Sequence, residues 1–158
     1  MAQKSTLPLR DNFNRKLTDL RISLTDQCNF RCSYCMPKET FGKGYQFLPK
    51  KELLSFEEIK LLSNAFVNLG VEKLRLTGGE PLLRKNIPEL ISDLKKLKTL
   101  QGKNVEVTLT TNGFLLQHFT SSLKKSGLDR ITISLDALDE NIFQQMIGGK
   151  YSPKIVLS

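Results

Sequence analysis

The chain of 158 residues contains one histidine and three cysteines, and it has no long apolar run. Without such a run no segment is expected to span a bilayer, and the polar start does not resemble a secretory leader. An odd number of cysteines in a chain without a leader argues against a disulfide framework. We therefore expect a cytoplasmic protein whose thiols are reduced.

Hydrophobic residues make up 39% of the chain and charged residues 25%, which is typical of a globular protein with a buried core. The formal net charge is +8. A lysine-rich solvated surface explains this excess, and attraction to a polyphosphate substrate is also compatible with it. The lysines are scattered and no nucleic-acid motif accompanies them, so we expect no nucleic-acid partner.

The three cysteines lie within one short segment, Cys28-Asn-Phe-Arg-Cys32-Ser-Tyr-Cys35, with the spacing C-x3-C-x2-C. Thiolates are soft ligands that favour iron–sulfur clusters, zinc or copper(I). A structural zinc site takes four protein ligands, and a conventional 4Fe–4S cluster takes one thiolate per iron. The only histidine, His118, lies far away in a helical stretch, where we expect a solvated surface residue. Three cysteines therefore predict a cluster with one iron free for another ligand, and zinc stays the alternative.

Apolar residues alternate along four segments and recur at helical spacing between them. The predicted strands cover residues 20–24, 71–77, 105–110 and 130–134, and the predicted helices begin at Ser55, Asn86, about Leu115 and Glu140. Ser55 and Glu58 match a capping box, and Asn86 stands where a cap is expected, with Pro88 in the first turn. The alternation predicts an α/β fold with a parallel sheet and right-handed crossovers. Because a complete (β/α) barrel needs about 250 residues, we expect a partial barrel of the first four or so units.

A chemically informative turn follows each predicted strand. The cysteines follow the first strand, Gly78-Gly79-Glu80-Pro81 the second, residues 110–113 (TTNG) the third and residues 134–137 (SLDA) the fourth. The two glycines allow close approach to a ligand, and Glu80 offers an acceptor for an ammonium or hydroxyl group; a plain strand-to-helix turn is the alternative. Because the carboxyl ends of parallel strands meet at one edge of the sheet, these turns predict one shared active site.

The cysteine spacing, with Tyr34 before the last cysteine and GGEP after the next strand, resembles the two motifs of radical S-adenosylmethionine (SAM) enzymes. Within that family, the stretches LRISLTDQCNFRCSYCMP, FLPKKELLSFEEI, LRLTGGEPLLR, TLTTNG and ISLDAL are similar to bacterial GTP 3′,8-cyclases of molybdenum-cofactor biosynthesis. The likeness runs from about Arg10 to Ile147. One departure is Asn14, where those enzymes usually have glycine in a D-x-F-G-R stretch.

The resemblance implies three groups of site residues. The SAM cluster would be held by Cys28, Cys32 and Cys35. The SAM site would be lined by Tyr34, Gly79 and Ser134, with Glu80 supporting the ammonium group. The residues facing GTP would be Arg21, Lys73, Arg75 and Thr110. Arginine suits phosphate because its planar fork donates two hydrogen bonds, and Lys73 shares a strand face with Arg75. An exposed strand end is the alternative for both, and a sheet-edge position for Thr110.

The resemblance also implies a reaction and its partners. In the family an electron from the cluster cleaves SAM to a 5′-deoxyadenosyl radical. The implied lyase abstracts hydrogen from the ribose C3′ of GTP, so that the carbon radical attacks C8 and gives 3′,8-cyclo-7,8-dihydro-GTP, the first step of molybdenum-cofactor biosynthesis. We nominate no general base, since hydrogen-atom transfer needs none. The implied partners are an electron donor such as flavodoxin or ferredoxin and the cyclic pyranopterin monophosphate synthase that acts on the product, with a homodimer left open.

We expect an N-terminal extension over residues 1–17 and a radical SAM core over residues 18–158 that is truncated at its C-terminal side. A second 4Fe–4S cluster is expected in the missing C-terminal part, which we expect the cyclase reaction to require. Two alternatives stay open at this point. One is another radical SAM enzyme, such as a peptide-modifying one, and the other is a non-catalytic iron–sulfur or zinc-binding fragment.

Overall fold

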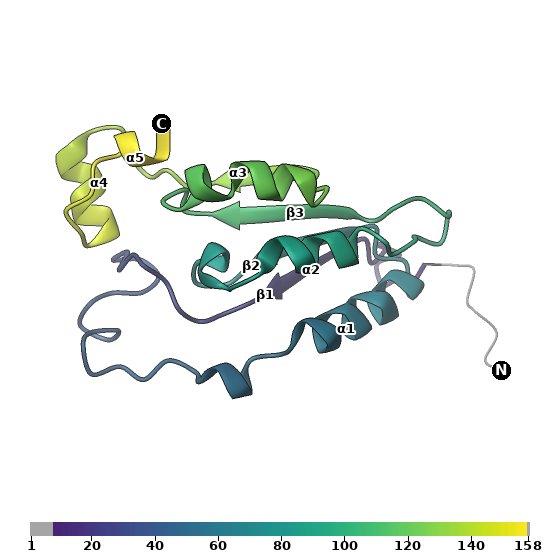
Figure 1. The fold of residues 1–158 in the computed structure, drawn as a ribbon. Helices are drawn as coiled ribbons and strands as arrows, with labels where there is room; N and C mark the ends of the chain where they lie inside the picture. The colour runs from purple at the N-terminus through teal and green to yellow at the C-terminus, as the bar shows by residue number, and fades with distance from the viewer. Residues whose placement is uncertain (1–7, 158) are drawn as a thin grey trace.

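The computed structural model describes residues 8–157 and contains a four-stranded parallel sheet (Figure 1). The strands pair in chain order, from β1 at one edge to β4 at the other. Their bounds are β1 (Asp19–Ser23), β2 (Lys73–Thr77), β3 (Glu106–Thr111) and β4 (Arg130–Ile133). Each strand lies close to its predicted range, and the predicted α/β fold with a parallel sheet is confirmed.

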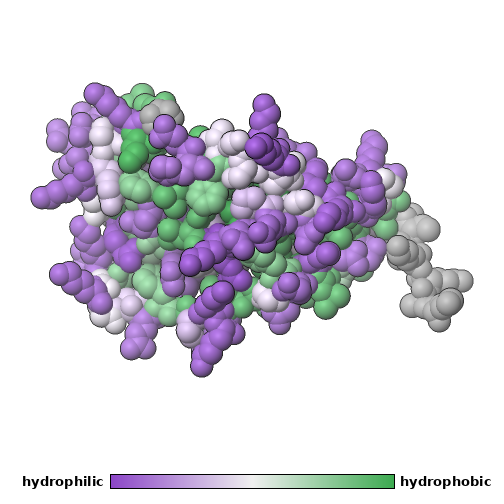
Figure 2. Space-filling view, in the orientation of Figure 1, coloured by the Kyte–Doolittle hydropathy of each residue, from purple (hydrophilic) through white to green (hydrophobic). Residues whose placement is uncertain are grey.

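One face of the sheet is apolar and covered by helices. Leu74, Leu76, Val107 and Leu109 share this face because side chains alternate along a strand, and all four are fully buried. Burial of each such side chain stabilises the fold by about 1.5–3 kcal/mol. The covering helices are α1 (Phe56–Asn68), α2 (Ile87–Leu94) and α3 (Leu116–Lys125). Figure 2 shows this side of the molecule, where hydrophilic side chains cover most of the outer helical surface.

The opposite face of the sheet carries charged and hydroxyl side chains. Asp19, Lys73 and Glu106 form one row across three strands, and Lys73 Nζ lies 3.5 Å from Asp19 Oδ2 and 3.8 Å from Glu106 Oε2. Arg21 and Arg75 are register neighbours in the next row. Parallel sheets are usually covered on both faces. A polar face on such a sheet therefore fits the inward side of an incomplete barrel.

The helix starts follow the predicted capping chemistry in one case and depart from it in another. Ser55 Oγ accepts from Glu58 N–H at 3.2 Å, and Ser55 N–H donates to Glu58 Oε2 at 2.7 Å, so the capping box is confirmed. Asn86 does occupy the position before α2, with Pro88 in the first turn, but its side chain makes no capping bond. Its backbone is left-handed, with φ of 60°, whereas a capping side chain needs an extended backbone.

Two short helices follow the sheet and lie beyond the carboxyl ends of the strands, beside the loop that follows β1 (Figure 1). They are α4 (Glu140–Ile147) and α5 (Lys154–Leu157). Phe143 and Ile147 of α4 and Val156 of α5 pack with Phe30 and Cys32 in a second apolar cluster. Two one-turn 3-10 helices, η1 (Lys50–Glu52) and η2 (Pro81–Leu83), flank the same edge of the sheet.

The described part of the expected N-terminal extension, residues 8–17, lies against the end of α1. Leu9 N–H donates to Leu69 O at 2.7 Å, and Leu17 N–H donates to Leu9 O at 2.9 Å. Residues 1–7 lie outside the described residues. Within residues 8–157, none of the helices is both long enough and apolar enough to cross a membrane.

Candidate functional site

The GGEP turn packs backbone to backbone against the segment that leads into the cysteines. Gly79 N–H donates to Thr25 O at 2.7 Å, and Glu80 N–H donates to Gln27 O at 2.8 Å. A Cβ atom on Gly79 would lie 2.2 Å from Gln27 O, and one on Gly78 would lie 2.6 Å from Thr25 O. The glycines are therefore needed because two stretches of main chain approach too closely for any side chain.

Glu80 ties the GGEP turn to the turn after β3. The side chain is 1% exposed and accepts hydrogen bonds from Leu82 N–H at 3.0 Å, Thr111 Oγ1 at 2.7 Å and Asn112 N–H at 2.8 Å. Burial raises the pKa of Glu80, and these three donors counter that rise by stabilising the charged form. The two predicted motifs are thus brought together by one buried carboxyl group.

The cysteine loop is held in shape by Arg31, which lies inside it. Arg31 Nη1 donates to Cys28 O at 2.7 Å and to Phe30 O at 2.8 Å, and Nε donates to Phe41 O at 2.8 Å. Helix α4 supports the same loop, because Arg31 N–H donates to Ile147 O at 2.9 Å. A Cβ atom on Gly148 would lie 2.4 Å from Arg31 O, so the end of α4 fits closely against the loop.

The three thiols differ in environment but influence one another. Cys32 is buried, Cys28 is half-buried and Cys35 is exposed. Burial, followed by the charge of Cys35, raises the pKa of Cys32 to about 12. Burial is also the main cause that raises the pKa of Cys28, where Phe30 N–H donates to Sγ at 3.4 Å and opposes the rise. The raised pKa values favour the protonated form of both sulfurs at neutral pH, and a bound metal would stabilise their thiolates.

The side chains present fit an iron–sulfur cluster. Within residues 8–157 no three Cys, His, Asp or Glu side chains already converge as a metal cage. The loop nevertheless offers three soft donors, and two buried polar atoms beside it have no partner among the described residues, Asp26 Oδ1 and Asn29 Nδ2. Unpartnered buried polar atoms are rare in proteins, and an amide N–H suits a sulfur acceptor. Cys28, Cys32 and Cys35 would be the ligands.

A cavity of about 470 Å³ opens beside the cysteines. Its lining includes Cys28, Cys35 and the backbone of Gly78 and Gly79, and its outer wall is aromatic. Three stacked or tilted rings form that wall: Phe41, Tyr45 and Phe47. The volume is in the range of pockets that hold small organic ligands. The structure therefore joins the first two motifs in one cavity, as the strand topology predicts.

Tyr34 and Ser134 lie near the outer rim of this edge of the sheet. Tyr34 is exposed, and its hydroxyl donates to Asp136 Oδ2 at 3.0 Å, which links the cysteine loop to the SLDA turn. Burial of the hydroxyl and the Asp136 carboxylate both raise the pKa of Tyr34. Ser134 N–H donates to Thr111 O at 2.9 Å, which fixes the start of the SLDA turn beside β3.

The residues expected to face GTP lie together on the polar face of the sheet. Arg21 Nη2 donates to Thr77 Oγ1 at 3.4 Å, and Arg75 Nη2 lies 3.3 Å from Asp19 Oδ2. Thr110 is on the same face, two residues beyond Thr108, which is the register partner of Arg75. The charge of Lys73 is neutralised more fully than that of Arg21 or Arg75, because Lys73 pairs with two carboxylates of its own row, those of Asp19 and Glu106.

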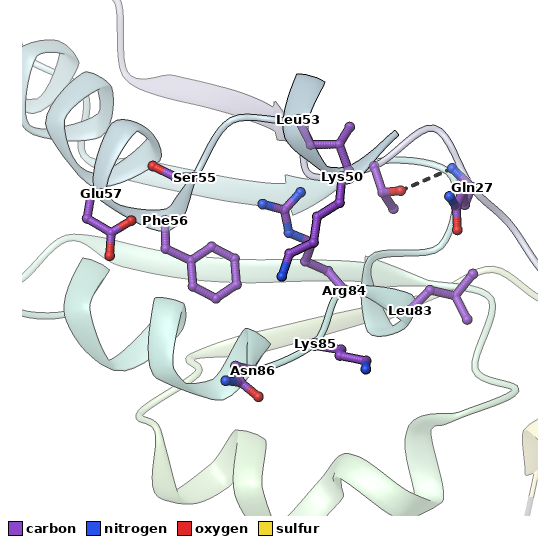
Figure 3. Close-up of a pocket in the computed structure, with 11 residues that line it drawn as sticks. Gln27, Lys50, Leu53, Ser55, Phe56, Glu57, Leu83, Arg84, Lys85 and Asn86 are labelled. Carbon is purple, nitrogen blue, oxygen red and sulfur yellow. Dashed lines mark hydrogen bonds between the residues drawn. The ribbon is translucent and has the colours of Figure 1, made fainter. Parts of the chain in front are cut away.

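A second cavity, of about 520 Å³, lies outside the sheet between the starts of α1 and α2 (Figure 3). Lys50 and Arg84 extend into it beside the Phe56 ring. Arg84 is a structural clamp: Nη1 donates to Leu24 O at 3.0 Å and Nη2 to Leu54 O at 2.5 Å. Its guanidinium also lies 5.3 Å from the centre of the Phe56 ring. The clamp braces the segment after β1 from behind the cysteine site.

Several residues that build the site were not singled out from the sequence: Arg31, Asn112, Asp136 and Gly148. Asn112 and Asp136 belong to turns that the strand topology does predict at this edge. Arg31 and Gly148 act through contacts with distant main chain, and no local pattern signals such contacts. His118 is exposed on α3, as expected for a solvated surface residue.

The fold and the site define a class of protein. A partial parallel α/β barrel carries three thiols, a cavity and a polar inner face at the carboxyl edge of its strands, which is where cofactor chemistry occurs in such folds. The family model of the Radical SAM superfamily matches residues 22–158. The chain therefore belongs to the radical SAM superfamily.

Among curated proteins, the chain is 50% identical over 138 residues to a GTP 3′,8-cyclase of Staphylococcus epidermidis, covering 87% of this chain and 39% of that protein. It is also 50% identical over 141 residues to a GTP 3′,8-cyclase of Acidothermus cellulolyticus, covering 89% and 38%. The chain thus spans less than half the length of these relatives. The crystal structure of Streptococcus suis SuiB bound to S-adenosylmethionine matches with a TM-score of 0.61 and 23% identity, covering 86% of this chain and 28% of that one. That likeness shows the shared fold.

Proposed function

We propose that this chain is the cluster- and SAM-binding part of a GTP 3′,8-cyclase, a radical SAM lyase. The observation that carries the proposal is the 50% identity to proteins of that name over 87% of the chain. The matched length is long enough to include the cysteine loop, the GGEP turn and most of the polar sheet face. Identity at this level favours a shared reaction over a shared fold alone.

In this proposal the cavity beside the cysteines takes SAM. Gly79 presents its backbone there, while Tyr34 and Ser134 border the same edge of the sheet. From the part of the chain that the structure describes, Glu80 Oε2 accepts a single hydrogen bond, from Asn112 N–H, and so keeps acceptor capacity for the SAM ammonium group. When bound, the cluster and SAM together supply the radical that takes a hydrogen atom from GTP. The aromatic wall of the cavity would exclude water from that radical.

Arg21 and Arg75 would bind the triphosphate of GTP on the polar face of the sheet. Two guanidinium groups in one register row repel each other unless an anion lies between them. Of the two arginines, Arg75 alone pairs with Asp19, at 3.3 Å, and Asp19 is shared with Lys73; among the described residues no carboxylate pairs with Arg21. Thr110 would add a hydroxyl contact, and Lys73 a weaker charge contact. The product would be 3′,8-cyclo-7,8-dihydro-GTP.

The proposal extends to parts and partners beyond this chain. A second 4Fe–4S cluster would lie in the remaining length of the parent protein. Flavodoxin or ferredoxin would donate the electron, and a cyclic pyranopterin monophosphate synthase would consume the product. The parent protein would work in the cytoplasm. Light scattering of the purified parent protein would give its oligomeric state.

Anaerobic reconstitution with iron and sulfide tests the proposal. We expect about four iron atoms per chain, and an EPR signal of the reduced cluster that changes when SAM is added. Equilibrium dialysis should then show GTP binding that weakens by about tenfold in R75A, equal to about 1.4 kcal/mol. R15A is the matched control, because Arg15 is exposed and its side chain contacts, among the described residues, its neighbours Asp11 and Phe13. One zinc per chain without iron would overturn the proposal, as would equal GTP binding by R75A and wild type.

A further inference from the structure

Asn112, in the turn after β3, connects the GGEP turn to the cysteine loop. Its backbone N–H donates to Glu80 Oε2 at 2.8 Å. Its side-chain Nδ2 donates to Asn29 Oδ1 at 2.9 Å and to Cys28 Sγ at 3.8 Å. Its own Oδ1 accepts from Phe114 N–H at 3.0 Å. One residue thus joins the buried carboxyl group to a cysteine sulfur.

The direction of the Asn112 amide is fixed by its partners. Oxygen and nitrogen of an asparagine side chain are hard to distinguish by shape and are assigned from hydrogen bonds. Phe114 N–H can only donate, so the atom facing it must be Oδ1. Nδ2 must then face Cys28 Sγ and Asn29 Oδ1, which are both acceptors. The donor toward the sulfur is therefore dictated by the turn itself.

We propose that Asn112 is a positioning residue of the cluster site, whose side-chain N–H holds the Cys28 sulfur and raises the reduction potential of the cluster bound there. Hydrogen bonds to ligand sulfurs draw negative charge from the cluster and favour its reduced form. Cys28 Sγ receives a second N–H from Phe30 at 3.4 Å, so Asn112 adds to an existing donor. The inference rests on the proposed function, because it requires the chain to hold a cluster.

The substitution N112D separates this role from a purely structural one. Asp keeps an oxygen for Phe114 N–H and keeps the backbone N–H for Glu80, so the turn retains its bonds. It loses the N–H toward Cys28 and Asn29, and it places a negative charge beside the sulfur. Leucine removes the donor without adding charge. A residue that only shapes the turn would therefore tolerate Asp better than Leu, whereas a donor to sulfur tolerates neither.

The experiment is an EPR-monitored redox titration of the anaerobically reconstituted chain, comparing wild type, N112D and N112L. We expect both variants to hold iron and to be reduced less readily, with the equilibrium constant for one-electron reduction lowered by about tenfold, or about 59 mV. The shift should be larger for N112D because of its charge. N86D is the matched control: Asn86 is exposed and makes no capping bond, so the wild-type potential should be kept. An unchanged potential in both Asn112 variants would overturn the proposal.

A second measurement decides the case in which neither variant holds iron. The chain carrying asparagine labelled at its side-chain nitrogen, in an N29D background that keeps the acceptor for Asn112, should show a weak nitrogen coupling to the reduced cluster in pulsed EPR. Absence of that coupling would overturn the role of Asn112. Failure of the proposed function gives a different result, because the wild-type chain itself would then assemble no cluster.

Discussion

Thr111 Oγ1 donates to Glu80 Oε1 at 2.7 Å, and this buried hydrogen bond joins two turns that are 31 residues apart in the chain. The same hydroxyl accepts from Gly113 N–H at 3.1 Å. Glu80 in turn holds Asn112 N–H, and Asn112 reaches the cysteine loop. This edge of the sheet is therefore fixed by a connected polar network, in which loss of one member leaves buried partners unsatisfied.

The free energy of unfolding should fall with rising pH because of Glu80. Burial raises its pKa above the ordinary value of 4.5, despite three hydrogen-bond donors. Between the ordinary pKa of Glu80 in the unfolded chain and its raised pKa in the folded chain, the folded chain binds more protons than the unfolded chain. The contribution of Glu80 to stability is therefore fully present below about pH 4.5 and is lost as pH rises through the raised pKa. Denaturant unfolding of wild type and E80Q over this window should show the wild-type advantage shrinking. An advantage that grows with pH would contradict the sign.

Two threonines on β3 should respond in opposite ways to replacement by valine. T111V removes a donor to the buried Glu80 carboxyl and an acceptor for Gly113 N–H, so we expect a loss of about 1–3 kcal/mol in the free energy of unfolding. Thr108 is also buried, but its Oγ1 has no partner among the described residues. T108V should therefore be neutral or stabilising. Equal losses in urea unfolding would show that the network does not stabilise the turns.

The positions of the helices and strands could be predicted from local pattern, because alternation and helical spacing arise from which face is buried. Ser55 and Glu58 illustrate a signal that lies entirely within one turn of chain. Asn86 shows the limit of such signals. Its residue type and place are right for a cap, but its left-handed backbone, which the sequence does not reveal, prevents the side chain from capping.

The site could be predicted only as far as the strand topology reaches. That topology brings the cysteines, GGEP and TTNG to one edge, because parallel strands share the direction of their carboxyl ends. The hydrogen bonds of Arg31 within the cysteine loop and the close fit of Gly148 depend on tertiary contacts of main-chain atoms. The glycines of GGEP were expected to let a ligand approach the turn. In the structure they also allow the main chain of the segment before Cys28 to approach the turn.

Arg84 should not be replaceable by lysine, although the charge is kept. The guanidinium donates to Leu24 O and Leu54 O at once and lies over Phe56, whereas an ammonium group cannot make this planar, two-sided contact. We expect R84K to lose about 1–2 kcal/mol in the free energy of unfolding, as charged hydrogen bonds are lost at a partly exposed site. R130K is the control, because the one ion pair of Arg130 within residues 8–157, at 3.6 Å, is exposed. Indistinguishable urea midpoints for the two variants would rule out the clamp.

Gly79 should be the least tolerant glycine of the chain, and Gly44 gives the comparison. A methyl group on Gly79 would lie 2.2 Å from Gln27 O, which is main chain and cannot move without shifting the segment before Cys28. We expect G79A to cost about 1–3 kcal/mol or more, and to lower both iron content and SAM binding after reconstitution, because the same shift displaces a ligand and the cavity wall. No atom of the described residues lies within 4 Å of a Cβ atom on Gly44, so G44A should be neutral or stabilise by about 0.4–1 kcal/mol. Unfolding curves, iron analysis and SAM dialysis on both variants check this. A G79A chain with wild-type stability would mean that the two main-chain segments can separate without consequence for the site.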